Sequence, residues 1–406
     1  MSRKHKHLAA VDAGSAKTCV VVAEEQENSR LRYLGFGSAE SKGWRKGAII
    51  NLEAVVGSLR KAVEEAEQEA KAPIERAVVG LGAGQVKGVN SRGGVTIASR
   101  QKEIEPEDVR KAIAEARRIS LPPDRVVLHV VPQEYLLDSL NGIRDPVGMM
   151  GSRLEANVHI ITSAAAAMTN LITAAHRAGL EVEETVHEAL AAAEALVGSD
   201  ERELGVVLAD VGAGSTDLVA YQHGCLAHSF ALPIGGDHFT NDIAVGLRTP
   251  IPEAEKIKRS FGVALASLAG ESVSIEVPSV GDRPSRMVPQ QKLAQILEPR
   301  AQELLALIKE ELARAGLERQ TGAGIVLTGG GARLAGLCDL AEQILDMPAR
   351  IGLPPRLDGA PESLCEPAYT ALMGLLFYAQ RLRLVREGGR EGLGAKLKSL
   401  FGGGKN

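Results

Sequence analysis

The chain has 406 residues, of which 45% are hydrophobic and only 3% aromatic, so it is long enough for two or more domains with aliphatic cores. Its formal net charge of −4 argues against general nucleic-acid binding, and the longest apolar stretch, residues 371–379, is far too short to span a membrane. The four cysteines are scattered without a Cys-x-x-Cys pair, which predicts reduced core residues rather than a metal site or a disulfide framework.

The first predicted element is a β-meander over residues 8–37, and its first turn is rich in glycine and hydroxyl residues. The turn consists of Asp12, Ala13, Gly14, Ser15, Ala16, Lys17 and Thr18. Glycine allows backbone amides to approach an anion without a Cβ in the way, and an aspartate at a strand end can hold hydrated Mg²⁺. On its own, however, an Asp-x-Gly sequence is better explained as an ordinary hairpin turn.

Strand and helix patterns then alternate through much of the chain, which indicates an α/β protein. Residues 85–162 differ in pattern and predict a small inserted α+β subdomain. The elements expected between residues 51 and 197 are helices over 51–70, 163–176 and 188–197, a helix beginning near 105–108, and strands over 77–82, 94–98, 126–131 and 156–162.

A second glycine-rich loop repeats the pattern of the first at mid-chain. It consists of Asp210, Val211, Gly212, Ala213, Gly214, Ser215, Thr216 and Asp217, and it runs into an apolar strand. Two copies of one loop pattern indicate two similar halves that close on one nucleotide, which a pair of unrelated hairpin turns does not explain.

The C-terminal half contains a third glycine-rich segment. Helices over 252–261 and 290–315 are expected around a strand-like stretch at 272–277, and a buried-type strand at 325–328 then leads into Gly329, Gly330 and Gly331 and a helix start. Consecutive glycines cost backbone entropy, so they favour a place where a flat group such as adenine approaches the main chain. A flexible connection is the alternative interpretation.

The last residues have a different composition from the rest of the chain. From residue 381 onward there are seven Lys or Arg residues against two Glu, and glycines punctuate the segment. Leu393, Leu397, Leu400 and Phe401 share one face of a predicted helix, flanked by Lys396 and Lys398. This is the pattern of a helix that lies in a membrane interface, and a disordered basic end is the alternative.

These motifs resemble those of a known protein superfamily. The two Asp-Gly loops and residues 328–333 are similar to the phosphate-1, phosphate-2 and adenosine motifs of the actin/Hsp70/sugar-kinase superfamily. Longer stretches resemble FtsA, the actin-like bacterial cell-division family, and these are residues 125–135, 144–149, 200–205, 276–281 and 323–330. The resemblance covers roughly residues 8–380 and departs from the family at Ser15, where threonine is frequent, and in a tail without tryptophan.

The resemblance implies an α/β, actin-like (ribonuclease H-like duplicated) ATPase fold, with two lobes around a nucleotide cleft and an FtsA-type insertion. The implied division is residues 1–84, 163–200 and 375–386 for subdomain 1A, 85–162 for the inserted subdomain 1C, 201–235 and 321–374 for subdomain 2A, 236–320 for subdomain 2B, and 387–406 for a flexible linker and a C-terminal amphipathic membrane-targeting helix.

The resemblance also implies a site for ATP and Mg²⁺. Asp12 and Asp210 would flank the metal ion, and Glu188 would orient the attacking water, although a first-turn helix acid is an equally good interpretation of Glu188. The implied nucleotide contacts are Gly14, Ser15, Lys17, Gly212, Gly214, Ser215, Thr216, Gly235, Gly236, Glu255, Lys258, Gly329, Gly330, Gly331 and Arg333. For Glu255 and Lys258 an exposed ion pair is the alternative.

The implied function is that of an adaptor in cell division with weak ATPase activity or none. It would polymerise like actin, tether FtsZ to the cytoplasmic face of the inner membrane at the septum, and recruit later divisome proteins. Arg286, Arg300 and Glu303 are the candidate contacts for the C-terminal peptide of FtsZ, and Leu393, Lys396, Leu397, Lys398, Leu400 and Phe401 are those for anionic lipid. The alternatives are a PilM-like pilus assembly protein, which should lack the amphipathic tail, and a carbohydrate kinase, for which no second catalytic motif is evident.

Overall fold

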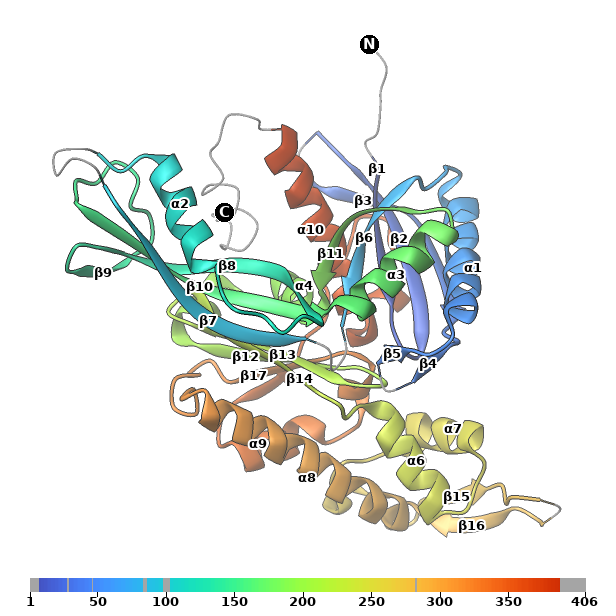
Figure 1. The fold of residues 1–406 in the computed structure, drawn as a ribbon. Helices are drawn as coiled ribbons and strands as arrows, with labels where there is room; N and C mark the ends of the chain where they lie inside the picture. The colour runs from blue at the N-terminus through green and yellow to red at the C-terminus, as the bar shows by residue number, and fades with distance from the viewer. Residues whose placement is uncertain are drawn as a thin grey trace.

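Two five-stranded sheets with the same topology form the centre of the molecule (Figure 1). The computed structural model describes residues 7–27, 29–45, 47–82, 86–97, 103–281 and 283–387. The first sheet contains β1 (His7–Ala13), β2 (Lys17–Glu25), β3 (Leu31–Glu40), β6 (Arg76–Leu81) and β11 (Glu181–His187). The second contains β12 (Val206–Val211), β13 (Thr216–Gln222), β14 (Cys225–Leu232), β17 (Ile325–Thr328) and β18 (Ala349–Ile351).

Each sheet combines an antiparallel meander with two parallel strands. The orders are β3-β2-β1-β6-β11 and β14-β13-β12-β17-β18, so β12 corresponds to β1 and β17 to β6. Strand β1 is antiparallel to β2 and parallel to β6, and in the same way β12 is antiparallel to β13 and parallel to β17. The β1–β2 and β12–β13 loops, which are the two glycine-rich loops, therefore occupy equivalent places in the two halves.

Two helices lie between the sheets and join the two lobes. They are α4 (Glu188–Leu196) and α10 (Thr370–Glu387). Residues 189–193 of α4 are fully buried, and four of these five residues are alanine, which lets another element approach closely. A Cβ added to Gly374 would lie only 2.0 Å from the carbonyl oxygen of Ala191, so the two helices cross in direct backbone contact. Their side chains share one buried cluster with residues of both sheets.

The outer face of the first sheet is covered by α1 (Leu52–Ala70) and α3 (Ala165–Arg177). Gly37 in β3 is required by this packing, because a Cβ there would lie 1.9 Å from the carbonyl oxygen of Ala62 in α1. A short hairpin, β4 (Trp44–Arg45) and β5 (Ala48–Ile49), connects β3 to α1.

The inserted segment forms a second small sheet with one helix, α2 (Pro106–Ala116). Its strands are β7 (Lys87–Thr96), β8 (Arg125–Leu137), β9 (Leu140–Ile143) and β10 (Arg153–Ala164), in the order β7-β10-β8-β9. The sheet packs against β14 through polar contacts, in which His159 bonds to Ser229 Oγ at 2.8 Å and Gln133 donates to the carbonyl of Leu226 at 2.8 Å. Burial lowers the pKa of His159 to about 3, so this contact uses a neutral imidazole.

The second sheet carries a helical layer with one further hairpin. The helices are α5 (Ser199–Leu204), α6 (Gly236–Gly246), α7 (Ile251–Phe261), α8 (Gln290–Arg314) and α9 (Leu337–Leu345), and the hairpin is β15 (Ser274–Val277) with β16 (Arg286–Pro289). Four short 3₁₀ segments complete the described elements: η1 (Ala266–Leu268), η2 (Gly330–Arg333), η3 (Glu362–Cys365) and η4 (Pro367–Tyr369). No helix in the described part of the chain is long and apolar enough to cross a membrane.

Several sequence expectations change in detail. The strand expected over 94–98 begins as early as Lys87 and ends at Thr96, and the strand expected over 126–131 extends to Leu137. The helix expected directly after the three glycines is a 3₁₀ turn, and α9 begins only at Leu337. All four cysteines are free, but only Cys19 is buried, whereas Cys225, Cys338 and Cys365 are partly exposed rather than core residues.

Two of the expected subdomain boundaries fall inside observed helices. The boundaries at 200/201 and 374/375 fall inside α5 and α10. Since α10 is one continuous helix that packs on α4, β1, β2 and β6, we assign all of it to the first lobe.

Candidate functional site

The two glycine-rich loops approach each other across the gap between the lobes. A Cβ added to Gly214 of the second loop would lie 2.8 Å from Ser15 Oγ of the first loop. The second loop is held in a tight turn by a hydrogen bond from the Gly212 amide to the Ser215 carbonyl, at 2.9 Å. Thr216 is fully buried, and its hydroxyl donates to the carbonyl of Ile234 at 2.7 Å.

A third backbone segment, at the start of α6, packs on the second loop. The amide of Gly236 donates to the carbonyl of Gly212, and the amide of Asp237 donates to the carbonyl of Ala213, both at 2.9 Å. A Cβ at Gly235 would lie 2.5 Å from the Ala213 carbonyl oxygen, so only glycine allows this approach. The positive end of the α6 helix is thereby placed beside the second loop, an arrangement suited to an anion.

Four carboxylates converge beside the loops. Asp12 lies near the end of β1, Asp210 and Asp217 are paired across β12 and β13, and Glu188 is the first residue of α4. A Cβ at Gly82 would lie 2.1 Å from Glu188 Oε2 and 3.5 Å from Asp217 Oδ2, which places these two acids close together. The sequence pattern places Asp217 in the second loop but predicts no role for it.

The acidic group is electrostatically strained. Burial raises the pKa of Asp12 to about 6, although Lys17 and the Gly14 amide act in the opposite direction. Burial, followed by the charges of Asp217 and Asp12, raises the pKa of Asp210 to about 8. Burial and the neighbouring acids Asp12, Asp217 and Asp210 hold the pKa of Glu188 well above its usual range. An added cation would relieve this repulsion.

The described residues contain no site that would hold a metal ion through protein side chains alone. Within them, no three Asp, Glu, His or Cys side chains are arranged to hold a metal ion.

Lys17 is the cation of the first loop, and it faces an aromatic ring. Its Nζ atom lies 3.2 Å from the centre of the Tyr369 ring, which η4 supplies. Burial lowers the pKa of Lys17, while the charges of Asp12 and Glu366 partly compensate. The ring also contacts Phe36 edge-on, with 5.5 Å between ring centres.

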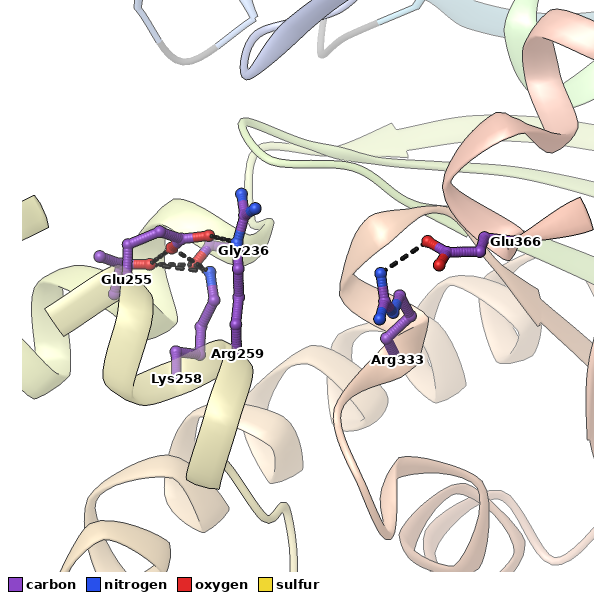
Figure 2. Close-up of polar contacts among 7 residues, drawn as sticks. Gly236, Glu255, Lys258, Arg259, Arg333 and Glu366 are labelled. Atoms are coloured by element: carbon purple, nitrogen blue, oxygen red, sulfur yellow. Dashed lines mark hydrogen bonds and ion pairs between the residues drawn. The ribbon is translucent and has the colours of Figure 1, made fainter. Parts of the chain in front are cut away.

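Glu255 and Lys258 share one face of α7 and form an ion pair at 2.6 Å, as the alternative interpretation of these two residues predicts (Figure 2). Lys258 also donates to the Gly236 carbonyl at 2.9 Å and to Thr240 Oγ1 at 2.8 Å. Arg259 pairs with Glu255 at 2.7 Å. The pair is therefore more than a surface contact, because it ties α7 to the first turn of α6.

The triple-glycine segment passes close to Asp210. Gly329 has a φ of +81°, and a Cβ there would lie 2.2 Å from Asp210 Oδ1. A Cβ at Gly331 would lie 2.4 Å from Val211 Cγ1, whereas the nearest atom to one at Gly330 is 3.9 Å away. Gly330 thus presents an open backbone.

Arg333 of η2 pairs at 2.7 Å with Glu366, which precedes η4, and Figure 2 shows this pair opposite the α7 residues.

The three residues expected to contact a partner lie in the second lobe. Arg300 on α8 binds both carboxylate oxygens of Asp242 on α6, at 2.7 and 3.1 Å, and also pairs with Glu303. Arg286 on β16 donates to the carbonyl of Leu247 at the end of α6. The residues expected to contact lipid, from Leu393 to Phe401, lie outside the described residues.

Two family models match the chain. Residues 207–374 match the model described as cell division protein FtsA, and residues 83–162 match that described as the SHS2 domain inserted in FTSA.

Curated relatives resemble nearly the whole chain. The cell division protein FtsA of Pseudomonas aeruginosa is 42% identical, over 92% of this chain and 89% of that protein. The cell division protein FtsA of Escherichia coli K12 is 37% identical, over 93% of this chain and 91% of that protein. That of Bacillus subtilis 168 is 35% identical, over 91% of this chain and 83% of that protein.

Solved structures share the fold at low sequence identity. A chain of the PilM-PilN type IV pilus biogenesis complex superposes with a TM-score of 0.66 at 17% identity, covering 92% of this chain and 98% of that chain. MreB5 of Spiroplasma citri bound to ADP superposes with a TM-score of 0.58 at 15% identity, covering 95% of this chain and 99% of that chain. The MamK double helical filament superposes with a TM-score of 0.53 at 14% identity, covering 93% of this chain and 100% of that chain. These likenesses show an actin-like fold.

We expect Asp210→Asn to stabilise the nucleotide-free protein, and more so at pH 8 than at pH 5. The folded-state pKa of about 8 lies above the ordinary 3.8, so the folded protein holds this proton longer than the unfolded chain does. The wild type therefore loses stability as the pH rises from about 4 to about 8, and the amide variant avoids that loss. Melting temperatures measured at both pH values check this, with exposed Asp358→Asn as the control. An equal effect of both variants at both pH values would contradict it.

Proposed function

The chain belongs to the FtsA family of cell division proteins, and we propose that it acts there as an ATP-binding, polymerising adaptor that tethers FtsZ to the cytoplasmic face of the inner membrane. The observation that carries the nucleotide part of this proposal is the contact between the two glycine-rich loops beside four carboxylates. The family relatives are 35–42% identical, so we favour this role over the PilM-like one, whose structural likeness is only 17% identical.

The loops are suited to the phosphates of the nucleotide. The two loops and the N-terminus of α6 meet at one place, and the dipole of α6 favours an anion there, while the amides of Gly212, Gly236 and Asp237 already donate to protein carbonyls. In the same fold, MreB5 of Spiroplasma citri has been solved bound to ADP and to AMPPNP. The adenosine would then lie toward Gly330, whose backbone is open, between the Glu255–Lys258 pair and Arg333.

The acidic group fits a magnesium ion that arrives with the nucleotide. Mg²⁺ prefers oxygen ligands, keeps several waters and usually binds through one or two carboxylates plus phosphate oxygens. Asp12 and Asp210 would hold it, and its charge would offset the burial that raises the pKa of both groups and the repulsion from Asp217 and Asp12 that raises the pKa of Asp210 further. The ion would supply charge neutralisation to the phosphates.

Asp12→Asn should weaken ATP binding about tenfold or more in Mg²⁺ but much less in EDTA, because the variant removes a fixed negative charge beside the ion. Titration with a fluorescent ATP analogue under both conditions measures this. Asp358→Asn, an exposed change of the same kind, should have no effect. Unchanged affinity of Asp12→Asn in Mg²⁺ would remove the metal assignment.

Glu188 is the residue that we propose orients water, and its surroundings make it a poor base. It begins α4 beside Asp217, and burial together with the neighbouring acids raises its pKa well above the usual range, so it holds its proton more tightly than an ordinary carboxyl group does. A general base works best with a pKa near the operating pH and in its deprotonated form. We therefore expect slow hydrolysis, with ATP acting mainly as a ligand that controls assembly.

Glu188→Gln should lower phosphate release from ATP while leaving affinity for the analogue within about twofold, because the amide keeps the shape but cannot accept the proton. Phosphate release over hours, measured beside analogue titration, separates the two. Hydrolysis equal to that of the wild type would leave Glu188 as a first-turn helix acid.

Partner and membrane contacts are assigned to different parts of the chain. Arg286 and Arg300 are the cations assigned to an acidic peptide, which would compete with Asp242 and Glu303 for Arg300, and exposed Val245 and Met287 lie on α6 and β16. The basic, apolar face of residues 393–401 suits anionic lipid at about 1 kcal/mol for each lysine. One short helix binds weakly, and a filament of many copies gains avidity.

A vesicle pelleting assay tests the tether. With anionic vesicles and ATP, the full chain should carry FtsZ into the pellet, and a chain truncated after Val385 should not. Arg300→Gln should reduce FtsZ in the pellet, whereas Arg314→Gln, another ion-paired arginine on α8, should not. Vesicle binding by the truncated chain would show that the tail is not the anchor. Equal FtsZ pelleting by the two arginine variants would show that the FtsZ peptide does not bind at Arg300.

A further inference from the structure

The short β4–β5 hairpin reaches from the first lobe to the second glycine-rich loop. A Cβ added to Gly214 would lie 2.9 Å from the amide nitrogen of Gly47 at the hairpin tip, as well as 2.8 Å from Ser15 Oγ. Three segments therefore meet at one point: the first loop, the second loop and the hairpin tip. Figure 1 shows β4 and β5 at the lower edge of the first lobe, facing the second.

The base of the hairpin is firmly attached to the first lobe. Its two strands pair as Trp44 with Ile49 and Arg45 with Ala48. Trp44 and Ile49 pack against the buried cluster beneath α1. The amides of Ile50 and Asn51 both donate to the carbonyl of Gly43, at 2.8 and 3.1 Å, and Asn51 in turn caps α1 through its side chain.

Two further features of the hairpin are the backbone conformation of Gly47 and the packing of Trp44. Gly47 has a φ of +72°, which is the left-handed conformation that favours glycine. The indole nitrogen of Trp44 is buried with no hydrogen-bond partner among the described residues. Trp44 is thus held by packing, and a shift of the hairpin breaks no hydrogen bond at its indole.

We propose that this hairpin is a strap that completes the phosphate end of the cleft, with Gly47 as a further nucleotide-positioning residue. The inference rests on the proposed nucleotide site. A polyphosphate bound between the loops lies beside the tip, so its binding and the position of the hairpin are coupled. Trp44 is the only tryptophan in the chain, so its fluorescence reports this coupling directly.

The contact itself is tested in the full chain without nucleotide. Gly214→Ala places a methyl group against the Gly47 amide and Ser15 Oγ, which pushes the tip away. The Trp44 emission should shift to longer wavelength as the hairpin loosens. Gly57→Ala, where a Cβ meets nothing within 4 Å, is the control. An emission spectrum of Gly214→Ala identical to that of the wild type would overturn the contact.

The coupling is tested with a fluorescent ATP analogue and, separately, with unlabelled Mg-ATP. Trp44 emission should change with the same midpoint as analogue binding. Gly47→Ala should weaken analogue binding about fivefold to tenfold, because a Cβ strains the left-handed conformation of this residue and displaces the tip from the bound polyphosphate. Gly142→Ala, whose φ of +74° is similarly strained but whose Cβ meets nothing, should leave binding unchanged.

The two proposals fail in different ways. Wild-type affinity in Gly47→Ala, together with a Trp44 signal that does not move as the analogue binds, would overturn the strap and leave the nucleotide site intact. Absence of analogue binding in the wild type would overturn the nucleotide site, and with it the positioning role of Gly47.

Discussion

The close crossing of α4 and α10 is the contact on which the arrangement of the lobes depends. Gly374 and Ala191 meet at a distance that leaves no room for a side chain at position 374. The alanines of α4 allow both sheets to pack on a thin helical layer, so one buried cluster extends from the first sheet to the second. Because α4 also begins with Glu188, the same crossing sets where that carboxylate lies.

The far end of α4 is held by charge rather than by close packing. Glu194 is almost fully buried and pairs with Arg202 of α5 at 3.4 Å and with Arg381 of α10. Arg202 also lies over the ring of Tyr221 in β13, 4.7 Å from its centre. Removing one member of such a buried group leaves an uncompensated charge, so we expect the network to specify one orientation of the lobes more than it adds stability.

The opposite end of the cleft has the reverse electrostatic character. There, four carboxylates lie close together, Lys17 acts on the pKa of Asp12 and Asp210, and that lysine faces an aromatic ring. The paired network and the strained acidic group lie at the two ends of one helix. A bound cation and polyphosphate would thus act at the end of α4 where the carboxylates repel one another. The strap at Gly47 would couple that change to the relative position of the lobes.

Much of the fold was determined by local sequence. The runs of valine, leucine and alanine after Asp12 and Asp210 predict buried strands, and the glycine-rich turns between them follow from backbone conformation. Both signals act within a few residues, which is why the duplicated meander and the helices over 51–70 and 290–315 agree with the structure. The family resemblance had the same basis, and the comparisons confirm it.

Tertiary structure alone decided which distant residues meet. Nothing near Asp217 indicates that it faces Glu188 across Gly82, because that contact depends on how α4 packs between the sheets. The bond between Arg300 and Asp242 depends in the same way on the packing of α8 against α6. The contact of Gly47 with Gly214 is set by the distance between the lobes, which no local preference encodes. Sequence patterns specify elements and turns, whereas side-chain convergence is a product of the packing that brings those elements together.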